Sequence, residues 1–227
     1  METIVISLGG SLIVPESIDY SFLHQFKQTI RKHYKKYKFV LVCGGGSIAR
    51  RYITSLEKEH KSTLELSLAG IRATRMNALF VTQLFGKEAN KSLPKDMHQV
   101  TTELQKNKVV ICGALRFSPN ATSDTTAAKL AHILKAKFIN LTNVKGLYSE
   151  DPRKNPKAKF IKKTSWKEFE ERAHKRKHHP GQHFILDQQA ATIVKKEKIP
   201  TYILGSSIQN LDRFLSNKKW VGTEIND

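Results

Sequence analysis

Two glycine turns, Gly9-Gly10-Ser11 and Gly44-Gly45-Gly46, are the residues whose types and spacing point most directly to chemistry. Each turn comes directly after a short apolar run, residues 3–8 and residues 39–43, with the length of a buried strand. A strand that ends in glycines and leads into a helix directs backbone N–H groups outward at the positive end of the helix dipole, which is an anion-binding geometry. Glycine lets the anion approach because it has no Cβ. One such turn is more often purely structural, but two together predict a site for two phosphorylated ligands.

Arg50 is a further candidate. Arg50 lies in the helix predicted after the second turn, where its planar guanidinium suits phosphate oxygens; the alternative is a solvated helix arginine. Asp124 is well suited to cap the helix that follows it. Neither glycine turn has the spacing of a P-loop or of a dinucleotide-binding motif, which disfavours both.

The elements that must position these residues alternate between apolar strands and amphipathic helices. This pattern predicts one α/β domain over residues 1–227, a three-layer α/β/α sandwich with a mostly parallel central sheet. Strands are expected at 3–8, 39–43, 109–112, 137–141 and 201–204, with 109–112, a helix over 125–135 and 137–141 forming one βαβ unit. The expected inward faces of the helices are Phe22, Leu23, Phe26 and Ile30; Ile48, Tyr52, Ile53 and Leu56; and Leu130, Ile133 and Leu134. Further helices are expected at 187–196 and up to about Leu215.

Other segments predict local structure rather than chemistry. Residues 149–159 contain two prolines among charges and should form a surface loop, and Ser165 to Glu168 matches a helix capping box. Residues 172–183 are basic and rich in histidine, and we interpret them as a mobile lid over phosphates. His174, His178, His179 and His183 have the spacing of metal ligands, but the neighbouring lysines and arginines repel a cation, so no metal site is expected.

The composition limits the class of protein. The chain has 227 residues, enough for a sizeable core, and its apolar runs are far shorter than a membrane-spanning helix needs. The N-terminus has no features of a secretory signal, so a cytoplasmic location is expected. Cys43 and Cys112 are expected to be buried reduced thiols. The formal charge of +19 favours anionic partners, but lysines are dispersed along the chain, and nucleic acid is therefore not an expected partner.

Several motifs taken together resemble those of one known family. They are Leu8-Gly9-Gly10-Ser11-Leu12-Ile13-Val14-Pro15, Gly44-Gly45-Gly46-Ser47-Ile48-Ala49-Arg50, the stretch from Gly70 to Ala78, and Thr142-Asn143-Val144-Lys145-Gly146-Leu147-Tyr148 with Asp151-Pro152. In this order, and over nearly the whole chain, they are similar to the signatures of the amino acid kinase superfamily, and best to its archaeal-type uridylate kinases.

The resemblance implies an acceptor-binding lobe over residues 1–135 and an ATP-binding lobe over 136–227. It implies catalytic roles for Arg50 and Asp124. It places ATP at Gly9, Gly10, Ser11, Gly46, Arg50, Thr142, Tyr148 and Asp151, and UMP at Gly45, Ser67, Asn120, Ala121, Thr122 and Ser123. The chain departs from the family pattern at Ser7, where many members have a lysine, at Ser67, which aligns with an aspartate, and at Lys145, which replaces a frequent aspartate.

The activity implied is transfer of the γ-phosphoryl group of ATP to UMP with Mg²⁺, by a protein that forms hexamers. Two alternatives remain open at this point. One is a kinase of the same superfamily with another acceptor, such as isopentenyl phosphate or a carboxylate. The other is a weakly catalytic, basic protein that binds nucleotide or RNA.

Overall fold

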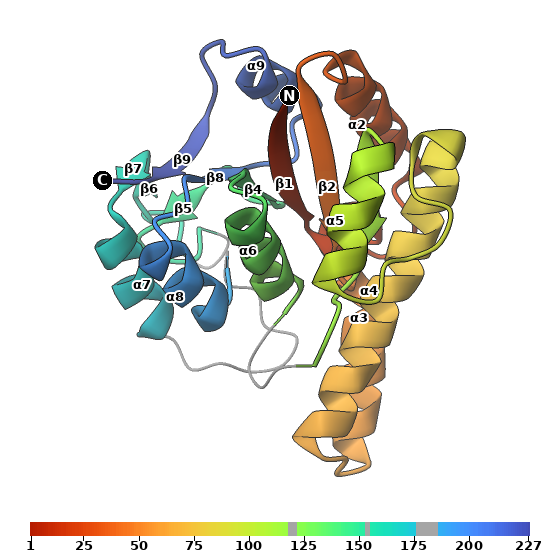
Figure 1. The fold of residues 1–227 in the computed structure, drawn as a ribbon. Helices are drawn as coiled ribbons and strands as arrows, with labels where there is room; N and C mark the ends of the chain where they lie inside the picture. The colour runs from red at the N-terminus through yellow and green to blue at the C-terminus, as the bar shows by residue number, and fades with distance from the viewer. Residues whose placement is uncertain (118–121, 153–154, 176–185) are drawn as a thin grey trace.

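The fold is built on one twisted central sheet with helices on both faces (Figure 1). The structure is a computed structural model that describes residues 1–117, 122–152, 155–175 and 186–227. Its main sheet has the strand order β3-β2-β1-β4-β8-β9-β7, and a small second sheet pairs β5 with β6. The main strands are β1 (Glu2–Leu8), β2 (Tyr37–Cys43), β3 (Val109–Cys112), β4 (Lys137–Leu141), β7 (Lys163–Thr164), β8 (Thr201–Leu204) and β9 (Gly222–Ile225); β5 is Leu147–Tyr148 and β6 is Phe160–Ile161.

Strands β1, β2, β3, β4 and β8 run parallel, while β9 is antiparallel to β8 and parallel to β7. The helices are α1 (Gly10–Ile13), α2 (Tyr20–Lys32), α3 (Gly46–Lys58), α4 (Thr63–Phe85), α5 (Met97–Lys106), α6 (Ser123–Ile133), α7 (Trp166–His174), α8 (Gln188–Lys196) and α9 (Ile208–Leu215), with a short 3-10 turn η1 at Gly86–Glu88. Within the described residues, no helix is long and apolar enough to cross a membrane.

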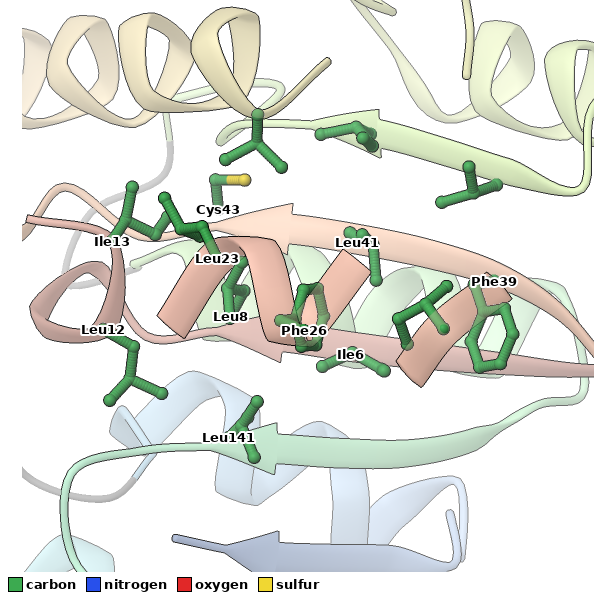
Figure 2. Close-up of a cluster of buried hydrophobic side chains, with 14 of the residues drawn as sticks. Ile6, Leu8, Leu12, Ile13, Leu23, Phe26, Phe39, Leu41, Cys43 and Leu141 are labelled. Carbon is green, nitrogen blue, oxygen red and sulfur yellow. The ribbon is translucent and has the colours of Figure 1, made fainter. Parts of the chain in front are cut away.

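Alternate residues of the strands supply two separate cores. Ile4, Ile6 and Leu8 of β1 pack in one core with α2, α4 and α9, and Val5 packs in the other with α5, α6, α7 and α8. Figure 2 shows the first core, where Phe26 and Leu23 of α2 lie over Ile6, Leu8 and their neighbours on β2. Strands buried on both faces are continuously apolar. The predicted three-layer α/β/α sandwich is therefore confirmed.

The parallel strands are the elements that the sequence locates best. Those expected at 109–112, 137–141 and 201–204 have the observed bounds, and the other two are longer by one or two residues at their start. The inward face of α2 is buried as expected, and so are Cys43 and Cys112. Burial raises the pKa of both thiols, that of Cys112 to about 12, so neither is a ready nucleophile.

Three expectations about packing are wrong. Strands β3 and β4 are not neighbours, because β2 and β1 lie between them, so α6 crosses over two strands instead of closing a simple βαβ unit. Tyr52 of α3 is 56% exposed, because α3 packs mainly on α4 and extends beyond the sheet (Figure 1). Ile133 is 50% exposed, because it lies in the last turn of α6.

The strand order places a topological switch point between β1 and β4. From β1 the chain moves toward β2 through helices on one face, and from β4 it moves the other way toward β8 through α7 and α8 on the opposite face. In open parallel sheets of this kind, ligands bind outside the carboxyl ends of the strands at the switch point. Both glycine turns lie at this edge, after β1 and after β2.

Candidate functional site at the carboxyl edge of the sheet

The two glycine turns touch each other through their backbones. The Gly44 N–H donates to the Leu8 carbonyl over 2.9 Å, and the Ser47 N–H donates to the Val14 carbonyl over 3.0 Å. A Cβ added to Gly10 would lie 2.0 Å from the Gly46 nitrogen, and one added to Gly44 would lie 2.5 Å from the Gly10 nitrogen. No side chain fits such spaces, so the contact between the turns requires glycine at these positions. The sequence suggests a different reason, namely that glycine lets a phosphate come close to the backbone.

This packing still leaves main-chain donors at the edge of the sheet. Among the described residues, the N–H groups of Gly10, Ser11 and Gly45 have no acceptor in the protein. Gly45 caps the N-terminus of α3 without a side-chain cap, so the positive end of this helix faces the same region. The predicted anion site therefore has the expected donors, contributed by both turns.

Residues from α4 hold the surrounding segments in place. Asn77 donates from its Nδ2 to the Gly44 carbonyl over 2.8 Å and is almost fully buried. Thr74 accepts from the Ala114 N–H over 2.9 Å, and the Arg75 guanidinium donates to the Ala114 and Leu115 carbonyls. The stretch from Gly70 to Ala78 thus positions both the second glycine turn and the chain that leaves β3.

A polar cluster lies beside the first turn, between β1 and β4. Ser7 and Asn140 are register partners on these strands, and both are buried. The Ser7 hydroxyl donates to Oδ1 of Asp124 over 2.5 Å, and Asn140 Nδ2 donates to the same oxygen over 3.1 Å. Asp124, in the first turn of α6, is therefore brought to the switch point, where it contacts Ser7, two residues before Gly9.

The environment of Asp124 changes its ionisation. The pKa of this carboxyl is raised to about 7, chiefly by burial and also by the negative charge of Asp187, while the hydrogen bond from Ser7 lowers it. A carboxyl with a pKa near neutrality in a ligand-binding edge is a recognised sign of a functional site. It also means that Asp124 carries less negative charge near neutral pH than an ordinary aspartate would.

Asp187 has a structural role that spans two helices. It caps α8 by accepting from the Ala190 N–H. It also accepts from the backbone and the hydroxyl of Thr122 and of Thr125, which fixes the start of α6. This start is capped by Thr122 and not by Asp124, so the capping interpretation of Asp124 is wrong and its carboxyl is directed toward Ser7 and Asn140.

The remaining candidates are distributed around the same edge. The Thr142 N–H donates to the Leu204 carbonyl at the ends of β4 and β8, and Tyr148 on β5 packs its ring 5.3 Å from that of Phe160. Asp151 lies in the connection between β5 and β6, and Arg50 lies in the second turn of α3. Ser67 is a half-buried residue of α4, and no hydrogen bond found among the described residues joins it to the glycine turns.

Some predictions fall elsewhere. Asn120, Ala121, His178, His179 and His183 lie outside the described residues. His174 ends α7, where its ring nitrogen lies 3.0 Å from the Thr192 hydroxyl. The capping box of Ser165 and Glu168 is confirmed. Asn140 is the site residue that sequence reasoning missed; its only signal is a polar side chain inside the apolar run of β4, in register with Ser7.

A mostly parallel sheet between two helical layers, with paired glycine turns at the switch point, defines a doubly wound α/β protein whose site lies at the carboxyl edge. The chain belongs to the amino acid kinase family, whose sequence pattern matches residues 2–205.

Individual relatives agree with this assignment. A uridylate kinase of Pyrococcus abyssi is 32% identical over 203 residues, 89% of each chain. A uridylate kinase of Archaeoglobus fulgidus is 32% identical over 223 residues, 98% of this chain and 99% of the relative. The crystal structure of an Archaeoglobus fulgidus uridylate kinase superposes with a TM-score of 0.84 and covers 99% of this chain and 100% of the other. A UMP kinase from Bacillus anthracis, 20% identical with a TM-score of 0.79, shares the fold.

Proposed function

We propose that this protein transfers the γ-phosphoryl group of ATP to UMP, giving ADP and UDP for pyrimidine nucleotide synthesis. The observation that carries the proposal is the contact between the two glycine turns at the switch point, which offers main-chain donors from both turns in one place. Transfer between two phosphorylated ligands needs such an arrangement, because both reactants must be aligned within contact distance. The uridylate kinases among the relatives support UMP as the acceptor.

In this proposal each of the two lobes binds one ligand. Residues 1–135 hold the acceptor, with its phosphate at Gly45 and its nucleoside against Ser67 and the segment 120–123. Residues 136–227 hold ATP, with the adenosine beside Thr142, Tyr148 and Asp151, which follow β4 at the same edge. The ATP phosphates lie on Gly9, Gly10, Ser11 and Gly46.

The transferring group requires positive charge, and Ser7 cannot provide it. In this proposal Arg50 supplies the positive charge, and its guanidinium would bind phosphate oxygens. Asp124, with its pKa near 7, limits the repulsion that a fully ionised carboxylate would exert on the γ-phosphate. Ser7 and Asn140 keep this carboxyl in place.

Mg²⁺ is the expected ion, and it would neutralise charge on the β- and γ-phosphates. Among the described residues there is no group of three or more His, Cys, Asp or Glu side chains able to hold a metal. The residues present therefore suit an ion held mainly by phosphates and water, as Mg²⁺ commonly is.

An acceptor screen tests the activity. Purified protein with Mg-ATP is assayed for ADP release with UMP, CMP, AMP, isopentenyl phosphate and acetylglutamate. We expect UMP to stimulate release most strongly. Stimulation by isopentenyl phosphate or acetylglutamate in place of UMP would assign a different acceptor, and no stimulation by any of them would reject a kinase role.

Neighbouring arginines provide a matched pair of variants for the site. Arg50→Gln should lower kcat/KM by about 10²-fold, because it removes a charge that contacts the phosphates. Arg51→Gln is the control, since the Arg51 side chain is 66% exposed and forms a long ion pair with the exposed Glu16, at 3.9 Å. Equal losses in both variants would show that general charge, and not contact at position 50, matters.

We also propose that the protein is a cytoplasmic homo-oligomer, with a hexamer as the expected state. Light scattering on the eluate of a sizing column measures the mass directly. A monomeric mass at micromolar concentration would contradict this expectation.

A further inference from the structure

Lysines gather at the amino-terminal edge of the sheet, opposite the candidate active site. The segments that lead into β2, β3, β4 and β8 all end at this edge, since these strands are parallel. We call the amino-edge lysines the set Lys35, Lys36, Lys106, Lys108, Lys135, Lys137, Lys196 and Lys198. Lysines are dispersed along the sequence, but the fold brings these eight, from four distant segments, to one side of the molecule.

Most of these charges are available to a partner. All of the amino-edge lysines except Lys137 are exposed. Lys137 pairs with Glu2 at 2.7 Å, and Lys196 lies 3.7 Å from Glu197. Among the described residues, Lys35, Lys106, Lys135 and Lys198 have no acidic partner within ion-pair distance. The edge therefore carries a clear excess of positive charge.

Two of the lysines occupy backbone positions that disfavour them. Lys135 and Lys198 have φ angles of 48° and 49°, in the left-handed region. Each follows a helix end that is closed by a backbone hydrogen bond to a carbonyl five residues back, from the Ala136 N–H to Ala131 and from the Ile199 N–H to Val194. Glycine or asparagine is the usual residue at this position, and α9 has Asn217 there. Lysine stands at Lys135 and Lys198 although glycine would fit the backbone with less strain. This indicates that a positive charge is favoured at these positions.

We propose that the amino-edge lysines form a binding surface for the phosphate backbone of a nucleic-acid duplex. From β3 to β8 the edge crosses four strand spacings of about 4.8 Å, roughly 19 Å in all. Duplex DNA presents one charge about every 1.7 Å along its axis, so such an edge faces on the order of ten phosphate charges. Lysine is a point charge that holds phosphates without reading bases, so binding is independent of sequence.

The same edge is poorly suited to other anionic macromolecules. Single strands are bound through exposed aromatic rings, and the described exposed aromatics, Tyr20, Tyr52 and Phe117, belong to other parts of the fold. A membrane surface needs apolar anchors beside the charges, and near this edge only Met1 and Ile133 are exposed among the described large hydrophobic residues. The surface is also separate from the proposed active site by the length of β1, about 20 Å.

The decisive variant is Lys135→Gly with Lys198→Gly, because it moves stability and binding in opposite directions. Binding of a labelled duplex of about 20 base pairs and mixed sequence is measured by fluorescence anisotropy from 50 to 300 mM salt. Loss of two phosphate contacts should reduce the slope of log K against log salt by about 1.8, and weaken binding about 60-fold at 0.1 M salt. The thermal midpoint should rise by about 2–4 °C, since the left-handed strain is relieved.

Two controls lie at the tip of α3 and α4, far from the amino edge (Figure 1). Lys58→Gln with Lys61→Gln removes the same net charge and should leave the salt slope unchanged. His60→Gly relieves another left-handed residue, with φ of 52°, and should raise the thermal midpoint without weakening duplex binding. UMP-dependent ADP release should be equal in all of these variants and the wild type.

The proposal is overturned if the wild type does not bind the duplex at 50 mM salt, or if the two charge-loss variants bind with equal affinity. It is also overturned if a single strand of equal length, or vesicles containing phosphatidylserine, displace the labelled duplex at a lower phosphate concentration than unlabelled duplex does. None of these outcomes depends on the kinase activity, so failure here and failure of the proposed function are distinguishable.

Discussion

Replacing Asp124 by asparagine tests whether burial really holds this carboxyl in its neutral form. The pKa of Asp124 is about 7 in the folded protein and 3.8 as its ordinary value, a difference of about 3 units. Each unit corresponds to about 1.36 kcal/mol, so the two states differ by about 4 kcal/mol. Asparagine has nearly the same shape, and its Oδ1 can still accept from Ser7 and Asn140.

The direction in which the free energy of unfolding changes with pH follows from how many protons each state binds. Between pH 4 and pH 7 the unfolded wild type has lost the Asp124 proton while the folded protein keeps it, so the stability of the wild type falls as pH rises. Above pH 7 Asp124 is ionised in both the folded and the unfolded state, so the stability of the wild type falls no further from this group. The asparagine variant has no proton to lose. Its free energy of unfolding, relative to the wild type, should therefore increase by about 4 kcal/mol from pH 4 to pH 8.

Urea unfolding followed by circular dichroism at several pH values gives this difference directly, without ligands present. Taking the difference between the two proteins removes the contributions of all other titrating groups. Glu57→Gln, in an exposed position of α3, is the matched control and should track the wild type at every pH. A difference that stays constant within about 1 kcal/mol, or that decreases as pH rises, would refute the reasoning.

Three further predictions concern neighbouring residues. Gly10→Ala should cost roughly 3 kcal/mol and abolish activity, since its Cβ would lie 2.0 Å from the Gly46 nitrogen. Gly70→Ala, inside α4 and with the nearest atom 3.5 Å from the added Cβ, should cost less than about 1 kcal/mol in the same urea unfolding experiment. Asp187→Ala should cost about 3 kcal/mol or more because it leaves the buried donors of α6 unpaired, while Asp96→Ala, which removes one exposed helix cap, should cost about 1 kcal/mol. Ser7→Ala should raise the pKa of Asp124 above 7, because the Ser7 hydrogen bond lowers it; the carboxyl chemical shift of ¹³C-labelled aspartate measures this, and an unchanged titration midpoint would contradict the assigned role of that bond.

The sequence predicts the fold well where local pattern is enough. Strands buried on both faces appear as short apolar runs, which is why β3, β4 and β8 have the expected bounds. The long helix α4 was not predicted, because its buried residues include Thr74, Asn77 and Thr82, which interrupt an apolar stripe. Strands β5, β6, β7 and β9 are two to four residues long and lack any comparable signal.

By itself, the sequence determined that two glycine turns follow two buried strands, and this was enough to predict a phosphate site and a parallel α/β fold. Only the tertiary structure decided that the turns touch through Gly10 and Gly46, and that Ser7 and Asn140 meet at Asp124, 117 residues from Ser7 along the chain. The physical reason is the range of the interactions. Strand formation depends on neighbouring residues, whereas close backbone contacts and the pKa of a buried carboxyl depend on which strands become neighbours in the sheet.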